Sequence, residues 1–144
     1  MTDNEKYLDQ FLWAKRELED IEREIAERRD DNSRLSSIPF DREYVTGSRN
    51  NDNSTQVKNM FLILEMERKQ IERRHTCLQL QYQMKTSIDQ MSDLTYRRIL
   101  TKKYIYGMKQ SAIARDLGYS NSRISELVRL ATDAFVIPDD AIYL

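Results

Sequence analysis

The sequence predicts an all-α protein, a long N-terminal helical hairpin followed by a small helix-turn-helix domain. Three observations support this prediction. The 144 residues include only three Gly and two Pro, too few turn residues for a many-stranded β fold. Hydrophobic residues make up 40% of the chain and charged residues 33%, which is too apolar for a disordered chain. Apolar residues also recur at helical spacing along most of the sequence.

The first predicted helix covers residues 4–30. Its apolar residues alternate in spacings of four and three, which is typical of a packed helical seam. These residues are Tyr7, Phe11, Ala14, Leu18, Ile21 and Ile25. The opposite face carries charged residues such as Lys15, Glu19 and Arg23. We therefore expect one face of this helix to pack against another element.

A predicted loop over residues 31–54 interrupts the helical pattern, because this stretch contains Pro39, Gly47 and the polar run SRNNDNST. We expect its apolar groups, Ile38-Pro39-Phe40 and Tyr44-Val45, to hold part of it against the helices. Helix signals return after Asn53-Ser54-Thr55, any of which can cap an N-terminus.

The second predicted helix extends to residue 91 and carries a heptad repeat. Its members are Val57, Leu64, Ile71 and Leu78, flanked by Met60, Phe61, His75 and Tyr82. Two amphipathic helices joined by a loop most simply form an antiparallel hairpin. Neither helix has a wide apolar face, so we expect the hairpin of residues 1–91 to pack also against a second copy, the C-terminal domain, or both. A homo-oligomer is the expected consequence.

Residues 92–135 form the predicted DNA-binding domain, and residues 136–144 are a C-terminal tail. Ser92 and Asp93 favour a helix start. This leading helix is expected to run to about Tyr106 and to end at Gly107. Its expected buried residues are Leu94, Ile99, Leu100 and Tyr104.

A helix-turn-helix pattern follows in KQSAIARDLGYSNSRISELVRLATDAF. The first helix is predicted over about Gln110 to Asp116, with Ala114 at a close crossing and Ile113 and Leu117 inward. Gly118 fits the tight turn because positive φ costs glycine little. We expect Tyr119 to fill the small core, Ser120 to cap the next helix, and Ile124 and Leu127 to face inward.

The charge of this segment favours a polyanionic partner, although the chain as a whole has a net charge of −1. Residues 92–135 hold eight basic and four acidic side chains. The alternative is a three-helix core used for protein contacts, which leaves the positive charge unexplained. The pairs Arg97-Arg98 and Lys102-Lys103 are more typical of a solvated helix face than of phosphate contacts, although their spacing leaves contact open.

The candidate DNA-contacting residues lie on the outward side of the second helix and around the turn. Asn121, Ser122, Ser125 and Glu126 occupy outward positions of the reading helix. Asn can pair with adenine, Glu can accept from cytosine, and Ser is permissive. Basic side chains hold phosphates without reading sequence. The candidates for that role are Arg123, Arg129, Lys109 and Arg115.

The stretch from Leu94 to Phe135 resembles region four of bacterial sigma factors. The resemblance is carried by LTYRRILTKKYIYG, SAIARDLGYS and SRISELVRLA. The whole chain resembles the small phage and prophage transcriptional regulators of the ArpU and RinA type, which place a polar helical region before a sigma-like helix-turn-helix. Sigma factors usually have bulkier charged residues at the base-reading positions. Nothing in this chain resembles the sigma segment that grips core polymerase, so a complete sigma factor is not expected.

These resemblances imply a sequence-specific transcriptional regulator, an activator of phage late genes that binds double-stranded DNA near promoters. Bacterial RNA polymerase is a further possible partner. The alternative is the small subunit of a phage terminase, which recognises packaging-site DNA and assembles into rings. Such subunits more often carry the helix-turn-helix at the N-terminus, whereas here it is C-terminal. A third alternative is a coiled-coil adaptor that does not bind DNA, but this function leaves the basic segment unexplained.

Other classes of protein find no support in the sequence. No apolar run approaches the roughly 20 residues of a membrane span, and MTDNEKYLDQ is too polar for a signal peptide. His75 and Cys77 have no partner cluster, so no metal or cofactor is expected. No phosphate loop or nucleophile constellation indicates an enzyme. We expect a soluble protein of the bacterial host cytoplasm.

Overall fold

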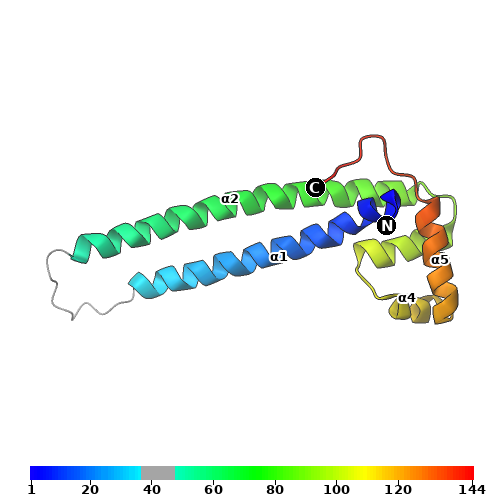
Figure 1. The fold of residues 1–144 in the computed structure, drawn as a ribbon, viewed down its shortest axis with the longest axis horizontal. Coiled ribbons are helices and arrows are strands. Elements are labelled where there is room, and N and C mark those ends of the chain that lie inside the picture. Colours follow the sequence, from blue (N-terminus) through cyan, green and yellow to red (C-terminus); the bar gives the residue numbers. More distant parts are fainter. Residues whose placement is uncertain (37–47) are drawn as a thin grey trace. The chain divides into compact units, whose positions relative to one another are not determined.

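The computed structural model describes residues 1–36 and 48–144, with side chains at 1–34 and 54–144. All regular structure in these ranges is helical, which confirms the all-α prediction. Figure 1 shows the elements, which are α1 (Asp3–Ser36), α2 (Ser48–Asp89), α3 (Leu94–Leu100), the π-helical turn η1 (Thr101–Ile105), α4 (Gln110–Leu117) and α5 (Asn121–Ala134). The predicted contacts of Ile38-Pro39-Phe40 and Tyr44-Val45 lie outside the described residues.

The chain forms two compact units. Unit 1 contains residues 1–16 and 76–144, and unit 2 contains residues 17–75. The boundaries fall inside α1 and α2, so the hairpin predicted as one region up to residue 91 is shared between the two units.

Unit 2 is an antiparallel helical hairpin. Three ion pairs connect its two helices, and their order along the chain gives the direction. Glu17 pairs with Arg73 at 3.6 Å, Glu22 pairs with Arg74 at 2.5 Å, and Arg29 pairs with Glu67. From the first to the last of these pairs the residue number rises from 17 to 29 in α1 and falls from 73 to 67 in α2, so the helices run in opposite directions.

Both long helices extend further into the predicted loop than the sequence pattern indicated. α1 continues to Ser36 and α2 begins at Ser48, so the predicted loop 31–54 is too long and the predicted caps at residues 53–55 are wrong. Arg34 pairs with Asp30 at 2.9 Å and with Asp31 at 3.9 Å. Such i,i+3 and i,i+4 pairs support a helix that has no apolar periodicity.

The heptad residues of α2 do not form the seam of the hairpin. Val57, Leu64, Ile71 and Leu78 are each half or more exposed. In the part of α2 whose side chains are described, from residue 54 on, the buried residues are Ile63, Cys77, Leu80, Met84, Ser87 and Ile88. On α1 the predicted face is largely right, because Tyr7, Phe11, Ala14 and Ile25 are buried and Leu18 and Ile21 are half-buried.

The core of unit 1 combines the ends of the long helices with α3, α4 and α5. Tyr7 and Leu8 of α1 are fully buried, as are Leu80, Met84 and Ile88 of α2. The Tyr7 ring stacks on Phe135 with the centroids 5.7 Å apart, and its hydroxyl donates to Gln83 Oε1 at 2.8 Å. Burial, with smaller contributions from Asp140 and Tyr143, raises the pKa of Tyr7 to about 12.

Two glutamine side chains fix the tail of residues 136–144 within unit 1. Gln83 accepts from the Ile142 amide at 2.9 Å and donates to the Asp140 carbonyl at 2.9 Å. Gln10 donates to the Ile142 carbonyl at 3.0 Å and accepts from the Leu144 amide at 2.8 Å. The tail has no regular secondary structure, so its backbone groups lack hydrogen-bond partners within the segment. The side-chain amides of Gln10 and Gln83 bond to these groups, which would otherwise depend on water.

The leading helix of the C-terminal domain ends in a π-helical turn. The Tyr106 amide donates to the Thr101 carbonyl at 3.1 Å, a spacing of five residues. Ile99, Leu100 and Tyr104 are buried as predicted, but Leu94 is 66% exposed, so its predicted burial is wrong. Leu94 is the first residue of α3, and the buried residues of that helix, Ile99 and Leu100, lie at its other end.

Candidate nucleic-acid interface

The turn between α4 and α5 is built around Gly118. Gly118 has φ +78°, and its left-handed backbone ends α4. The Tyr119 amide donates to the Ala114 carbonyl at 2.8 Å, which satisfies one of the last carbonyls of the helix. Ala114 is buried on α4, which packs against α5. The small residue and the glycine thus take the positions the sequence assigned to them.

Ser120 is the N-cap of α5. Its hydroxyl accepts from the Arg123 amide at 3.2 Å, which satisfies one of the free amides at the start of the helix. Ile124 and Leu127 face the core as predicted, together with Val128, Ala131 and Thr132. The cap and the inward stripe together set the rotation of α5, and therefore which side chains point outward.

The four predicted base-reading residues are all exposed on α5. They are Asn121, Ser122, Ser125 and Glu126. Ser122, Ser125 and Glu126 are exposed because they lie on the side of the helical wheel away from the buried Ile124 and Leu127, whereas Asn121 is exposed as the first residue of the helix. Among the residues the structure describes, no hydrogen bond involves the Asn121 side chain, which leaves its amide available to a ligand.

Two of the other candidates are held by neighbours. Ser125 Oγ donates to Gln110 Oε1 of α4 at 3.1 Å. Arg123 Nη1 donates to Glu126 Oε2 at 2.9 Å. Glu126 therefore neutralises one of the predicted phosphate-binding cations. The sequence analysis missed Gln110, whose placement opposite Ser125 depends on how α4 crosses α5.

Three further cations of the predicted set are exposed and free of ion pairs within the described ranges. Lys109 is the residue before α4, Arg115 lies on α4, and Arg129 lies on α5. Unpaired cations bind phosphate without first breaking an internal salt bridge, so these three are better placed for that role than Arg123.

The basic run of the leading helix surrounds a separate groove of about 450 Å³ in unit 1. Its lining includes Lys85, Arg97, Arg98, Lys102 and Asp116 together with the apolar Leu94, Tyr106 and Leu117. Arg97 donates to the Met91 carbonyl, and Lys102 pairs with Asp116. Lys103 lies over the Tyr104 ring at 5.0 Å, so three of these four cations have internal partners. The same three are half-buried and only Arg98 is exposed, so the predicted solvated face holds for Arg98 alone.

The core position predicted for Tyr119 is wrong. Its side chain is 38% exposed and lies in the turn itself, and Leu117 is only half-buried. Ile113 of α4 and Ile105 of η1 are buried in this domain. Tyr119 therefore stands beside the start of α5, within the candidate interface.

Comparisons with family models, with curated proteins and with solved structures found no match to this chain. Within the described ranges, no group of His, Cys, Asp and Glu side chains is arranged to hold a metal ion. In the same part of the chain, no helix combines the length and apolar character needed to cross a membrane.

Proposed function

We propose that this protein is a sequence-specific DNA-binding transcriptional regulator, an activator of phage late genes that acts near promoters in the cytoplasm of a bacterial host. The observation that carries the proposal is the geometry of α4 and α5. A glycine turn, a serine N-cap and an inward apolar stripe leave Asn121 exposed in the first turn of α5. This is the geometry of a helix-turn-helix whose second helix enters the major groove.

The size and chemistry of α5 support groove binding. An α-helix with its side chains is about 10–12 Å across, and the major groove of B-DNA is about 12 Å wide. The N-terminal turn of α5 leads with small polar residues, Asn121 and Ser122, which allow close approach to base edges. The Asn121 amide offers the donor and acceptor that match adenine N7 and N6.

Phosphate contacts are assigned to the exposed cations Lys109, Arg115 and Arg129. They come from the start of α4, its last turn and the middle of α5, so they are spread over both helices of the motif. Such contacts fix the register of a protein on the duplex and supply most of the non-specific affinity. Bacterial RNA polymerase and further copies of the chain are the proposed protein partners.

The test is a fluorescence-anisotropy titration of the full-length protein on duplex DNA at several salt concentrations. Because each phosphate contact releases counterions, the log–log slope should be roughly −0.9 per contact. Arg129→Ala should flatten the slope by about one unit. Arg23→Ala is the matched control, since Arg23 is an exposed arginine of unit 2 that pairs only locally with Asp20 at 3.9 Å. Salt-independent binding, or equal effects of the two variants, would refute the proposal.

The full chain is needed in this experiment because residues outside a 92–144 fragment hold the candidate interface in place. Asn4 of α1 donates to the carbonyls of Thr132 at 2.9 Å and Phe135 at 2.7 Å, so it holds the end of α5. Such a fragment would also lose the Tyr7 ring of α1, which stacks on Phe135. Its failure to bind would then report unfolding and not the absence of an interface.

A further inference from the structure

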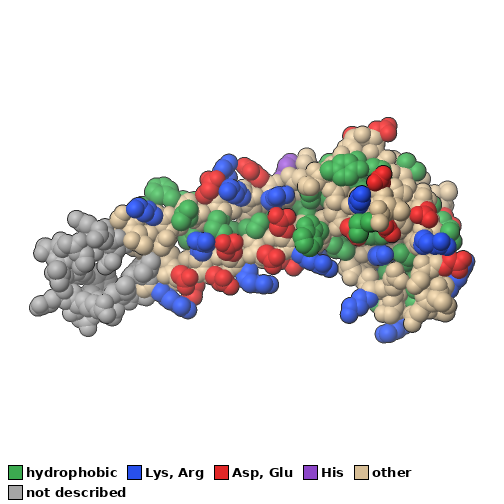
Figure 2. All heavy atoms as spheres, viewed as in Figure 1, with side chains coloured by type: hydrophobic (Ala, Val, Ile, Leu, Met, Phe, Trp, Pro, Cys, Tyr) green, Lys and Arg blue, Asp and Glu red, His purple; other side chains and the backbone are tan. Residues whose placement is uncertain are grey.

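Helix α2 exposes a mostly apolar stripe, interrupted by Arg68 and His75, which we call the outer stripe. Its residues follow one another at spacings of four and three: Val57, Phe61, Leu64, Arg68, Ile71 and His75, continued along the same helix by Leu78 and Tyr82. All six apolar members are half or more exposed. Figure 2 shows apolar side chains in green between the charged ones on the surface of the long helices. This spacing is the a/d pattern of a coiled-coil seam, here without a partner.

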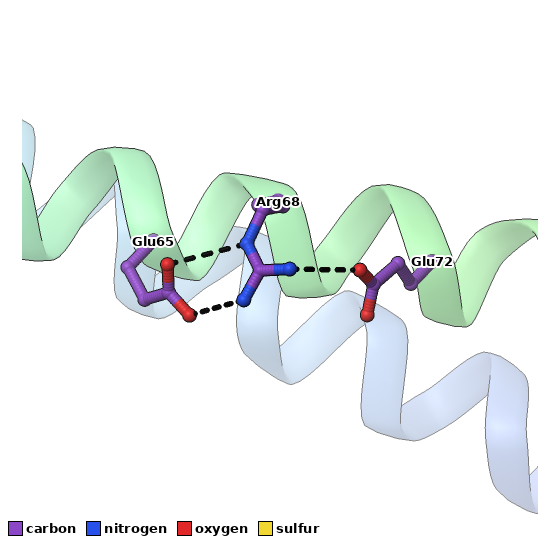
Figure 3. A network of polar contacts seen from close by, with 3 residues as sticks. All are labelled: Glu65, Arg68 and Glu72. Carbon is purple, nitrogen blue, oxygen red and sulfur yellow. Dashed lines mark hydrogen bonds and ion pairs between the residues drawn. The ribbon is translucent and has the colours of Figure 1, made fainter.

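The arginine within the outer stripe is already paired inside its own helix. Arg68 donates to Glu65 at 2.6 and 3.2 Å and to Glu72 at 3.1 Å (Figure 3). The hydrogen bonds from Arg68 lower the pKa of Glu65, so this carboxylate is charged at neutral pH. Burial of a charge is costly when it is unpaired, and Arg68 brings its own counter-charges into any interface.

We propose that the outer stripe binds the outer stripe of a second copy of this chain, with the two α2 helices antiparallel. The stripe is symmetric about the midpoint between Lys69 and Gln70. In the antiparallel register centred there, Arg68 lies opposite Ile71 and Leu64 opposite His75 of the second copy. The outer layers then place Phe61 opposite Leu78 and Val57 opposite Tyr82. All eight positions of each stripe therefore find a partner.

The charges beside the stripe favour this orientation. In the antiparallel register Glu67 faces Arg74 of the second copy on one flank, where each also has an ion pair with α1, to Arg29 and to Glu22. On the other flank Glu65 faces Glu72 of the second copy, and the two Arg68 side chains lie among these carboxylates and offset part of their repulsion. A parallel, in-register pair instead places Arg68 against Arg68 and Glu67 against Glu72. Flanking charges of this kind determine orientation in coiled coils, and like charges disfavour the parallel pair.

This interface goes beyond the proposed DNA binding and is tested without DNA. Sedimentation of the full-length protein should show self-association in the micromolar range. Leu64→Asp should make the protein monomeric with unchanged helicity by circular dichroism, because Leu64 is exposed and outside the core. Leu62→Asp is the matched control, since Leu62 is 53% exposed and lies off the stripe, and it should still associate. A monomeric wild type, or equal effects of the two variants, would overturn the proposal.

Disulfide cross-linking tests the register. In a Cys77→Ser background, the double variant Leu64→Cys with His75→Cys should form a covalent dimer on air oxidation. Each single variant should remain uncross-linked, because position 64 meets position 75 and not itself. Lys69→Cys, an exposed position off the stripe, controls for random collision. Cross-linking of the single variants, or none in the double variant, would overturn the antiparallel register whether or not the protein binds DNA.

Discussion

Arg123 donates a 2.9 Å hydrogen bond to Glu126, one turn further along α5, so a candidate phosphate-binding cation is neutralised by a candidate base-reading acid. The pair is about half exposed on both sides, and a surface pair of this kind contributes little to stability. In the proposed DNA complex, a phosphate could engage Arg123 only by competing with Glu126, and Glu126 would bring negative charge toward the phosphates.

Glu126→Gln should accordingly strengthen DNA binding on all sequences. The substitution releases Arg123 for a phosphate, so the slope of log affinity against log salt should steepen by about one unit. Anisotropy titrations on specific and random duplexes measure this change. Asp133→Gln removes a carboxylate near the end of α5 and is the control. A loss of affinity confined to one base position would show instead that Glu126 reads cytosine.

Asn121→Ala should weaken binding to the preferred site by about 1–3 kcal/mol and relax specificity at one base pair. The reason is that Asn121 is exposed at the first position of α5 with its amide free of partners in the described part of the chain. Binding-site selection on both proteins is the measurement, with Ser122→Ala as the neighbouring control. Identical sequence preferences for wild type and Asn121→Ala would mean that Asn121 reads no base.

The local geometry of this interface could be predicted from the sequence, but the seam of the hairpin could not. Gly118 and Ser120 act on neighbours within a few residues, so their effects are readable from spacing alone. On α2, two stripes have a seven-residue repeat. The heptad that includes Leu64 is the more hydrophobic in sequence, yet the one through Ile63, Cys77 and Met84 is buried. Periodicity shows that a seam exists but not which partner it faces.

The sequence also could not predict which segments of the chain come together in unit 1. The bonds from Asn4 to Thr132 and from Gln10 to Ile142 join residues more than 120 positions apart. Asn and Gln give no periodic signal, and their partners are backbone carbonyls that every residue possesses. The tail therefore looked like an appendage, whereas the structure places it among the polar contacts of α1 and α2.

Tyr7 makes unit 1 sensitive to alkaline pH. Its pKa is raised to about 12 from the ordinary value of 10, so the folded protein holds this proton more tightly than the unfolded chain does. The resulting stabilisation is complete below pH 10 and is lost as the pH rises toward 12. The unfolding temperatures of wild type and Tyr7→Phe should therefore converge over this pH range. The other tyrosines titrate in both proteins, so they do not contribute to the difference.

At neutral pH, Tyr7→Phe should cost about 1 kcal/mol, the value of the lost hydrogen bond to Gln83. Gln83 Oε1 keeps the Ile142 amide as a donor, so the substitution leaves no orphaned acceptor. Tyr104→Phe is a useful comparison, since its hydroxyl lies at a longer 3.5 Å from Thr132 Oγ1. A constant difference between wild type and Tyr7→Phe up to pH 12 would contradict the titration of Tyr7.

Both positive-φ glycines of unit 1 should lose stability on substitution by alanine. Gly118→Ala should cost about 1–2 kcal/mol, because φ is +78° while no atom lies within 4 Å of the added Cβ. Gly107→Ala should cost a similar amount, since φ is +69° and the added Cβ would lie at an ordinary van der Waals distance of 3.4 Å from Leu12 Cδ2. Urea denaturation of both variants measures the two costs. A much larger cost at Gly107 would show that Leu12 cannot accommodate the added Cβ.

Arg68→Leu should strengthen self-association and at the same time make the register of the two helices less specific. The substitution places a leucine in the outer stripe between Leu64 and Ile71, which adds apolar area to the seam. It also removes the cation that disfavours a parallel pair, and a single polar residue in such a seam specifies register at a cost in stability. Sedimentation should show a tighter complex. In the Cys77→Ser background, cysteine at position 64 alone should now cross-link in addition to the 64–75 pair. A weaker complex would show that Arg68 binds carboxylates across the interface as well as within its own helix.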